Sequence, residues 1–326
     1  MNVLSPDTID TEEALRRCRR YLRHTPLLPS AGLSALAGRP VLLKLECLQV
    51  TGSFKARGAI NRLLQLGDDE RARGVVTASA GNHGQAVAWA ASVLGIPATV
   101  VLPLDAVQVK VERTRSWGAT VVQAGNGYDE AHHHAELLCE RTGAVYIHAF
   151  EHPDVIAGQG TVAHEILDEC PEAGLLVAPV GGGGLIAGIG AAARTHKRRP
   201  QVIGLQSSST SAMFDALEAG HLVPVTLLPT LADGLAGETT EASMRLCRQL
   251  DIAVRLVPEV ALLPAIRHTL IEEHLAIEGS AAVCVAGVLE RVIDAGAADG
   301  PMVLVLSGGN VDPAVLAAAL AHEVPA

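Results

Sequence analysis

Lys55 is the residue of this sequence best placed to act as a nucleophile. It lies in the stretch 51–59 (TGSFKARGA), between a predicted strand and an apolar-periodic segment that begins at Ile60. A lysine at the beginning of a helix, among apolar neighbours, loses its proton more readily than a lysine in water. Its neutral amine can then form an imine with a carbonyl compound. The alternative is a solvated lysine in a first helical turn, which is the commoner role of this residue type.

Two loops rich in small residues each follow a predicted strand and lead into a predicted helix. The first loop follows Val75–Ala78 and comprises Ser79, Ala80, Gly81, Asn82 and His83. Its small residues and side-chain donors suit a substrate carboxylate at a helix N-terminus, and the alternative is a capped helix start. The second loop follows residues 175–178 and comprises Gly181, Gly182, Gly183, Gly184 and Leu185. Four successive glycines favour a nest of N–H groups around a phosphate, with a flexible turn as the alternative.

A third loop, Ser307-Gly308-Gly309-Asn310, follows the apolar stretch 302–306. The Ser307 hydroxyl could contact a ring nitrogen of a cofactor, and the alternative is a capped turn before a helix at Pro313. The glycine loop does not fit a dinucleotide, because Gln206 stands where an acid should hold the ribose. It also lacks the lysine of a nucleotide-binding P-loop. The four segments together therefore predict a ring that carries an aldehyde and a compact phosphate.

A regular alternation of strands and helices must position these loops. The predicted strands are 41–46, 75–78, 98–102, 119–123, 175–178, 202–205 and 302–306. The predicted helices are 11–22, one after Lys55, 84–94, 107–117, 128–141, 160–169, one from Leu185 and one at Pro313. Repeated units of this kind predict an α/β fold with a parallel sheet that helices cover on both faces. Ligands of such sheets bind beyond the carboxyl ends of the strands, which is where the motifs lie.

Composition excludes several classes of protein. The 326 residues suit two domains, and 49% hydrophobic residues with 2% aromatics predict a core of aliphatic side chains. A net charge of −10 argues against nucleic-acid and anionic-membrane partners. The first twenty residues lack the apolar core of a signal peptide, and Pro179 with four glycines interrupts the uncharged run 174–193. Six scattered cysteines without metal-ligand spacing predict buried thiols in a reducing cytoplasm.

These motifs, in this order, resemble those of the fold-type II pyridoxal-phosphate enzymes, specifically the threonine and serine dehydratase and serine racemase family. The match runs from His24-Thr25-Pro26-Leu27 to the loop 307–310. The resemblance implies a two-domain α/β fold like the β-subunit of tryptophan synthase, with twisted, mostly parallel sheets and helices on both faces. Residues 1–69 and 150–326 would form a large cofactor-binding domain. Residues 70–149 would form a small domain that closes over the active site.

The resemblance also implies a role for each motif toward pyridoxal 5'-phosphate. Lys55 would form the Schiff base, Phe54 would lie against the cofactor, and Asn82 would contact the ring hydroxyl. The glycine loop, residues 181–185, would bind the phosphate, and Ser307 would contact the pyridine nitrogen. The substrate carboxylate would bind at Ser79, Ala80, Gly81, Asn82 and His83. Glu278 matches a family position near the cofactor ring, and the alternative is an acid at a helix N-terminus.

Three departures from the family pattern narrow the prediction. Racemases that resemble this protein carry a serine where this chain has Ala80, so a proton donor on the far face is missing and elimination is favoured. The stretch 206–211 (QSSSTS) lacks the carboxylates of the family's divalent-cation site, so we expect no metal there. His132 stands where racemases place an arginine near the substrate carboxylate. It could take that role, and the alternative is that His132, His133 and His134 form a solvated helix face.

The resemblance therefore implies a cytoplasmic lyase that removes water and ammonia from a β-hydroxy-α-amino acid, by default L-threonine or L-serine, to give a 2-keto acid. Alternatives in the same fold are a dehydratase of 3-hydroxyaspartate, phenylserine or a hydroxyectoine-derived amino acid, an amino-acid racemase, and a β-replacement synthase. A non-catalytic amino-acid-binding relative is the alternative from another class. We expect a homodimer or homotetramer, and no isoleucine feedback, because the sequence shows no C-terminal regulatory domain.

Overall fold

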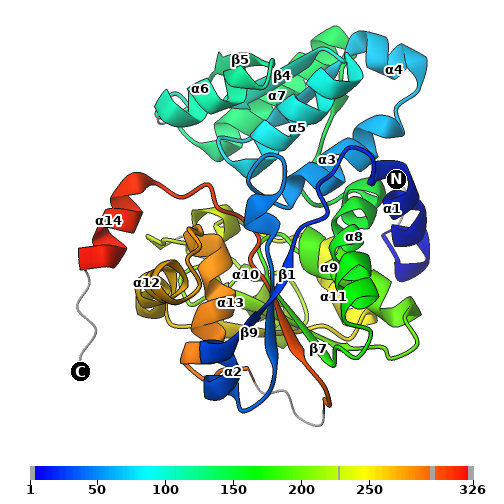
Figure 1. Ribbon diagram of the computed structural model, residues 1–326. Coiled ribbons are helices and arrows are strands. Elements are labelled where there is room, and N and C mark those ends of the chain that lie inside the picture. The colour runs from blue at the N-terminus through cyan, green and yellow to red at the C-terminus, as the bar shows by residue number, and fades with distance from the viewer. Residues whose placement is uncertain (1–3, 107, 227, 294–297, 322–326) are drawn as a thin grey trace.

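The computed structural model describes residues 4–106, 108–226, 228–293 and 298–321, which form two sheets flanked by helices (Figure 1). The larger sheet has six strands in the order β1-β2-β10-β7-β8-β9. These strands are β1 (Leu27–Ser30), β2 (Val41–Lys44), β7 (Leu175–Pro179), β8 (Gln201–Ser207), β9 (Ala253–Val257) and β10 (Met302–Val305). Strand β1 runs antiparallel to β2, and every other neighbouring pair in this sheet is parallel.

The smaller sheet has four parallel strands in the order β5-β4-β3-β6 and lies in the upper part of Figure 1. Its strands are β3 (Val75–Ala78), β4 (Ala98–Leu102), β5 (Thr120–Gln123) and β6 (Val145–Tyr146). The helices around it are α4 (Asp68–Arg73), α5 (Asn82–Leu94), α6 (Gln108–Ser116) and α7 (Tyr128–Thr142). All four strands come from one continuous part of the chain, between the two parts that supply the larger sheet.

Helices cover both faces of the larger sheet. On one face pack α8 (Pro153–Glu169) and α9 (Gly184–Thr195), and on the other α2 (Ala31–Ala37), α12 (Leu262–Glu272) and α13 (Gly279–Leu289). Successive residues of β7 alternate between the two cores, since Leu175 and Val177 join one cluster and Leu176 joins the other. This alternation follows from the two-residue repeat of a strand, and it explains why the strand reads as a continuous apolar run. The predicted alternating α/β fold with parallel sheets is confirmed.

The remaining helices complete the described fold. They are α1 (Thr11–Cys18), α3 (Lys55–Leu64), α10 (Ala212–Ala219), α11 (Glu241–Gln249) and α14 (Pro313–Ala321), with the 3₁₀ turns η2 (Glu46–Leu48) and η3 (Asp233–Leu235) among the short elements. Helix α3 packs against α8 and α5 and so stands between the two sheets (Figure 1).

Several predicted boundaries were wrong for identifiable reasons. The predicted helix 11–22 ends at Cys18, and the predicted strand 41–46 ends at Lys44, because Glu46 turns inward at the beginning of η2. Helix α8 begins at Pro153 rather than at residue 160, with Pro153 in the first turn. Gly158 lies inside this helix and is required there, since a Cβ at this position would lie 2.5 Å from the carbonyl oxygen of Arg57.

Candidate active site

Lys55 is the first residue of α3, and its side chain is half-buried beside the ring of Phe54. Its Nζ donates a hydrogen bond to the carbonyl oxygen of Ala149 at 3.0 Å and lies 5.2 Å from the Phe54 ring centroid. Burial lowers the pKa of Lys55 to about 8, although the charge of Glu278 opposes this effect. The residue can therefore supply an uncharged amine near neutral pH, which is the form that attacks a carbonyl carbon.

The serine loop 307–310 holds the segment that precedes Lys55. The amide of Phe54 donates to the carbonyl oxygen of Ser307 at 3.0 Å, and Ser53 forms an isolated antiparallel bridge with Gly308. The Ser307 side chain is buried. Two segments that are more than 250 residues apart in the chain thus meet at Lys55. They follow β2 and β10, which are neighbouring parallel strands and therefore end at the same edge of the sheet.

Asn82, Glu278 and Asn310 form a second cluster at this edge of the sheets. Asn82 Nδ2 donates to the two carboxylate oxygens of Glu278 at 2.8 and 3.0 Å, and Asn310 Nδ2 donates to Asn82 Oδ1 at 2.7 Å. Asn310 Nδ2 also lies 2.9 Å from the carbonyl oxygen of Thr51. Burial raises the pKa of Glu278 to about 7, against the hydrogen bond from Asn82, which lowers it. The cluster joins the serine-containing loop 79–83 to the lysine segment.

The glycine loop has a shape that side chains would disrupt. Gly183 has a φ of 99°, a left-handed conformation that favours glycine. A Cβ on Gly182 would overlap the Phe150 ring, and one on Gly184 would lie 2.9 Å from the Phe150 Cβ. Helix α9 begins at Gly184, and the first N–H groups of a helix lack intrahelical acceptors. The loop is therefore suited to an anion, and it lies beside Phe150, the residue that follows the carbonyl partner of Lys55.

The loop 79–83 leads into α5, which begins at Asn82. Ser79 Oγ accepts a hydrogen bond from the amide of Gly81 at 3.2 Å, and a Cβ on Gly81 would meet no atom within 4 Å. Ala80 is half-buried. His83 is buried, with Nε2 3.0 Å from the carbonyl oxygen of Ile147, and burial together with the charge of Lys55 lowers its pKa to about 3. His83 is therefore neutral and offers no positive charge to a substrate carboxylate.

His132 packs into a row of aromatic rings rather than standing free in solvent. Its ring stacks on Tyr128, with centroids 6.0 Å apart, and meets Tyr146 edge-on at 5.1 Å. The row continues through His148 to Phe150, whose centroids are 4.7 Å apart. The neighbouring His133 and His134 are exposed, so the solvated-face alternative holds for them and not for His132.

Sequence reasoning missed three features of this region. Phe150 shapes the glycine loop, but it follows no motif, and only the scarcity of phenylalanine, three in the chain, could have drawn attention to it. Asn310 belongs to the serine loop but was given no role. At the stretch 206–211, the Ser207 hydroxyl donates to Glu259, a carboxylate from outside that stretch, which also accepts from the Leu231 amide at 2.7 Å. Among the described residues, no group of three or more His, Cys, Asp or Glu side chains could share a metal ion.

A family model described as "Pyridoxal-phosphate dependent enzyme" matches residues 19–308. The chain belongs to this family. It is 42% identical over 304 residues to an L-threonine ammonia-lyase of Thermotoga maritima, and the match covers 93% of this chain and 75% of that protein. The processed form of threonine deaminase isoform 2 from Solanum lycopersicum superposes with a TM-score of 0.87 at 32% identity, over 98% of this chain and 91% of the other. Maize serine racemase superposes with a TM-score of 0.91 at 31% identity, over 98% and 97%.

These comparisons confirm the predicted resemblance, the fold class and the dependence on pyridoxal phosphate. The protein is a pyridoxal-phosphate dependent enzyme. Its sequence relatives include proteins named as ammonia-lyases, and the similar solved structures include one named as a racemase. Within the ranges that the structure describes, no helix is long and apolar enough to cross a membrane.

The residues present fit pyridoxal phosphate. The buried hydroxyls of Thr51, Ser53 and Ser280 have no hydrogen-bond partner among the described residues, and they flank Lys55 and Glu278 in the chain. The Lys55 amine, with its lowered pKa, suits an aldehyde. The glycine turn at the N-terminus of α9 suits a phosphate, and the unpaired hydroxyls suit a polar ring.

Proposed function

We propose that this protein is an ammonia-lyase that removes water and ammonia from a β-hydroxy-α-amino acid, with L-threonine as the first substrate to test and L-serine as the second. The observation that carries the proposal is the Lys55 amine, whose pKa is lowered to about 8 at the first turn of α3. The relatives named as L-threonine ammonia-lyases support the reaction and the substrate class.

Each motif would act on the bound cofactor or substrate through groups described above. Lys55 would hold the cofactor aldehyde and, once released, accept the α-proton with its neutral amine. The amides of the glycine loop would hold the phosphate, and the Ser307 hydroxyl would meet the ring nitrogen without adding charge. Asn82 would contact the ring oxygen with the side-chain amide that here donates to Glu278. When bound, pyridoxal phosphate supplies the electron withdrawal that makes the α-proton acidic.

Ala80 favours elimination over racemisation. Racemisation requires a proton donor on the face opposite Lys55, and a methyl side chain supplies none. In an elimination the β-hydroxyl leaves instead, so no second donor to the α-carbon is needed. The similarity to maize serine racemase keeps racemisation as the second candidate.

Residues 70–149 would form the small domain that closes over the substrate, with residues 1–69 and 150–326 as the large domain. The four-stranded sheet supports this division, because all of its strands lie between residues 75 and 146. Closure would bring Ser79 and its neighbours over the amine and exclude water from the site.

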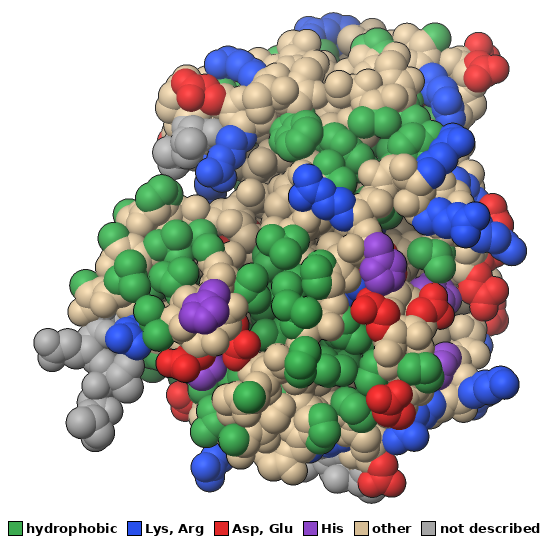
Figure 2. Space-filling view, in the orientation of Figure 1, with side chains coloured by type: hydrophobic (Ala, Val, Ile, Leu, Met, Phe, Trp, Pro, Cys, Tyr) green, Lys and Arg blue, Asp and Glu red, His purple; other side chains and the backbone are tan. Residues whose placement is uncertain are grey.

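A homodimer or homotetramer in the cytoplasm is the assembly and location that we favour. Figure 2 shows apolar side chains gathered over the lower part of the visible face. Exposed apolar residues of the larger-sheet part include Leu28, Leu36 and Ile271, and such surface is a common site of contact between copies. The six cysteines are free thiols, five buried and Cys139 half-buried, which suits a reducing compartment. Sedimentation velocity of the holoenzyme tests the assembly.

The function is tested by 2-keto acid release from a panel of L- and D-β-hydroxy amino acids, with chiral analysis of the remaining substrate. Keto acid from L-threonine or L-serine without inverted substrate supports the lyase. Inverted substrate with little keto acid would establish the racemase instead. The panel also includes 3-hydroxyaspartate and phenylserine, which separate a specialised dehydratase from a general one.

Replacement of Lys55 by alanine tests the role of the amine. We expect a loss of turnover of at least about 10²–10⁴-fold, the share that a positioned proton-transfer group contributes. Lys197→Ala is the matched control, because Lys197 is an exposed lysine outside the site. Activity retained in Lys55→Ala would refute the assignment.

A further inference from the structure

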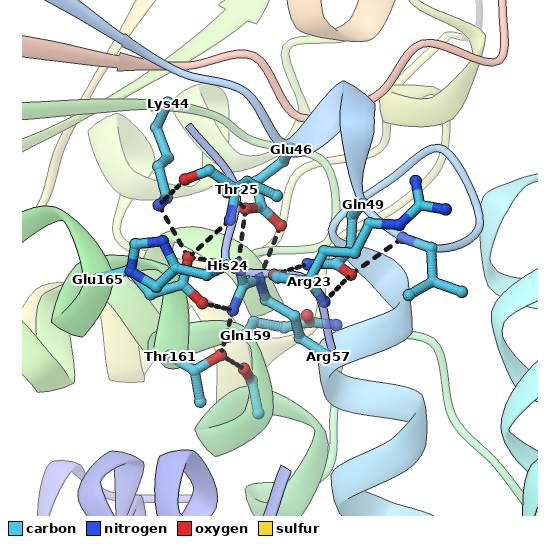
Figure 3. Close-up of polar contacts among 12 residues, drawn as sticks. Arg23, His24, Thr25, Lys44, Glu46, Gln49, Arg57, Gln159, Thr161 and Glu165 are labelled. Carbon is cyan, nitrogen blue, oxygen red and sulfur yellow. Dashed lines mark hydrogen bonds and ion pairs between the residues drawn. The ribbon is translucent and has the colours of Figure 1, made fainter. Parts of the chain in front are cut away.

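Four buried charged side chains form a network between α3 and α8 (Figure 3). Its Lys44 also lies 3.5 Å from Glu169, a partly exposed carboxylate outside this group of four. Arg57, Lys44 and Glu46 are fully buried, and Glu165 is 6% exposed. These four side chains carry two positive and two negative charges. Burial raises the pKa of Glu165, but Arg57 and Lys44 together lower it below its ordinary value, so the carboxylate is ionised.

Arg57 lies at the centre, and its guanidinium makes five hydrogen bonds. Nε donates to Glu46 at 2.7 Å, and Nη2 donates to Glu46 at 2.8 Å and to Glu165 at 2.9 Å. Nη1 donates to Glu165 at 2.7 Å and to the Thr161 hydroxyl at 3.1 Å. Since a guanidinium has five N–H donors, every donor of Arg57 is paired. Two carboxylates and one hydroxyl thus fix its position and orientation.

The network joins segments that approach α3 from different parts of the chain. Lys44 ends β2 and donates to Glu165 at 2.8 Å and to the carbonyl oxygen of Thr25 at 2.6 Å. Glu46 begins η2, and Glu165 comes from α8. The amide of Gly58 also donates to the Gln159 side chain of α8 at 3.1 Å. One helix turn is therefore bonded directly to η2 and α8, and through the two carboxylates to β2 and the segment before β1.

Lys55 lies on the opposite side of the same turn. Successive residues of an α-helix are rotated by about 100°, so residues two apart leave the helix about 200° apart. Arg57 enters the network behind the helix, while Lys55 points forward to the carbonyl oxygen of Ala149. That acceptor lies just before α8, the helix that also carries Glu165 and Thr161. Helix α3 thus carries the amine, and the acceptor of the amine lies in the segment that leads into α8.

A network of this kind is poorly explained by stability alone. Desolvation of four buried charges cancels much of their attraction, and apolar side chains of similar volume often stabilise a core equally well. What paired charges add is a single preferred geometry, since each N–H has one acceptor to meet. We propose that the Arg57 network is a positioning device for Lys55, which fixes the first turn of α3 so that the amine meets the cofactor aldehyde and the α-proton. The proposal rests on the role of Lys55 in the proposed function.

The test compares Arg57→Lys with Ile266→Ala in the holoenzyme. Arg57→Lys keeps the positive charge but cannot bind two carboxylates through a planar fork. Ile266→Ala removes a fully buried side chain of α12, a helix that carries no residue of the site, and so supplies a loss of stability without a change at α3. Urea unfolding gives the stability of each variant, and titration of each apoprotein with pyridoxal phosphate gives the affinity and the visible absorption band of the lysine-bound cofactor.

We expect both variants to unfold at lower urea concentration than the wild type. Arg57→Lys should in addition bind pyridoxal phosphate at least about tenfold more weakly, shift the pH midpoint of its absorption band and lower kcat by about 10²-fold, the scale of a 1 Å misplacement. KM should change much less than kcat. Ile266→Ala should retain the cofactor affinity, the band and kcat. If Arg57→Lys resembles Ile266→Ala in these three properties, the network is structural only and the proposal is overturned.

Thr161→Val keeps the experiment decisive if Arg57→Lys fails to fold. It removes one acceptor of Arg57 and leaves all four charges in place, so the same shifts should be present and smaller, and their absence overturns the proposal. Failure of the proposed function is recognised separately. If the proposed function is wrong, the wild type shows no absorption band of lysine-bound cofactor, or Lys55→Ala retains that band. Either result is independent of what the Arg57 variants show.

Discussion

Glu165 and Glu278 are both buried carboxyl groups, but their surroundings move their pKa values in opposite directions. Glu165 accepts hydrogen bonds from Arg57 and pairs with Lys44, and its pKa falls. Glu278 accepts from the uncharged amide of Asn82, and its pKa rises to about 7. Equal burial therefore gives an always-charged group in the Arg57 network and a group that titrates near neutral pH beside Lys55.

This difference distinguishes two regions of the molecule. The side chains around Arg57 fix the position of α3, and the side chains around Lys55 can change their charge near neutral pH. Around Arg57, each charged side chain lies against a side chain of opposite charge. Around Lys55, the amine has a pKa of about 8 and the neighbouring acid a pKa of about 7, so both lie close to the pH at which an enzyme works. Perturbed groups gathered in one place are typical of active sites.

The largest effect should follow from removing the central cation of the Arg57 network. Arg57→Leu leaves Glu165 buried with Lys44 as its remaining charged partner, and leaves Glu46 buried with only the Thr25 hydroxyl as a side-chain partner. We expect the free energy of unfolding to fall by about 3–5 kcal/mol, measured by urea denaturation. Arg16→Leu, at an exposed arginine paired with Glu13, is the matched control and should cost less than about 1 kcal/mol. A loss below about 1 kcal/mol for Arg57→Leu would mean that the network is replaceable.

Glu278→Gln should raise the free energy of unfolding, whereas Arg57→Leu lowers it, and the size of the increase should depend on pH. The pKa of Glu278 is about 7 in the folded protein, against 4.5 for an ordinary glutamate. The folded state therefore binds more protons between these values, so wild-type stability falls as pH rises from 4.5 through 7. In the apoprotein, Glu278→Gln should be more stable than the wild type at pH 8 by up to about 3 kcal/mol, and this advantage should narrow toward pH 5. Unfolding at both pH values measures it, and a constant difference would contradict it.

The rate at which the apoprotein binds pyridoxal phosphate should depend on the protonation state of Lys55. Because the neutral amine attacks, the rate should rise as pH increases through a midpoint near 8, by about fivefold between pH 7 and 8. Glu278→Gln should move this midpoint downward, because the charge of Glu278 raises the pKa of Lys55. Stopped-flow absorbance at a series of pH values measures the midpoint. A midpoint that does not move would show that Glu278 and Lys55 are uncoupled.

The smallest effect is expected at Glu169, a carboxylate outside the Arg57 network that lies 3.5 Å from Lys44. His24 lies 3.7 Å from Glu169, and both side chains are well exposed. His24→Ala should change the free energy of unfolding by less than about 1 kcal/mol, because solvent screens such pairs. A loss comparable to that of Arg57→Leu would show that the number of ion pairs, rather than their burial, decides the stability of this region.

The sequence predicted the part of the site that lies in loops after parallel strands. Lys55, the glycine loop and Ser307 could be placed together because carboxyl ends of parallel strands share one edge of a sheet. The Arg57 network could not be predicted, since Glu46 and Glu165 lie 11 and 108 residues from Arg57 and no local repeat relates them. The beginning of α8 was missed because Gly158 weakens a helical pattern. Glycine is required at position 158 because α8 contacts α3 there, and only the folded chain shows that contact.

That contact has a consequence for the motions of the molecule. Gly158 of α8 approaches the backbone of Arg57 and Gly58, and Gly160 approaches the backbone of Gly188 in α9, so α3, α8 and α9 touch backbone to backbone. Their amide hydrogens should exchange with solvent as one cooperative unit, at rates set by global unfolding, while amides of α6 exchange through local opening. We therefore expect the amine of Lys55 to be carried by the slowest-opening part of the chain, and the motions that admit substrate to belong to the proposed small domain, residues 70–149.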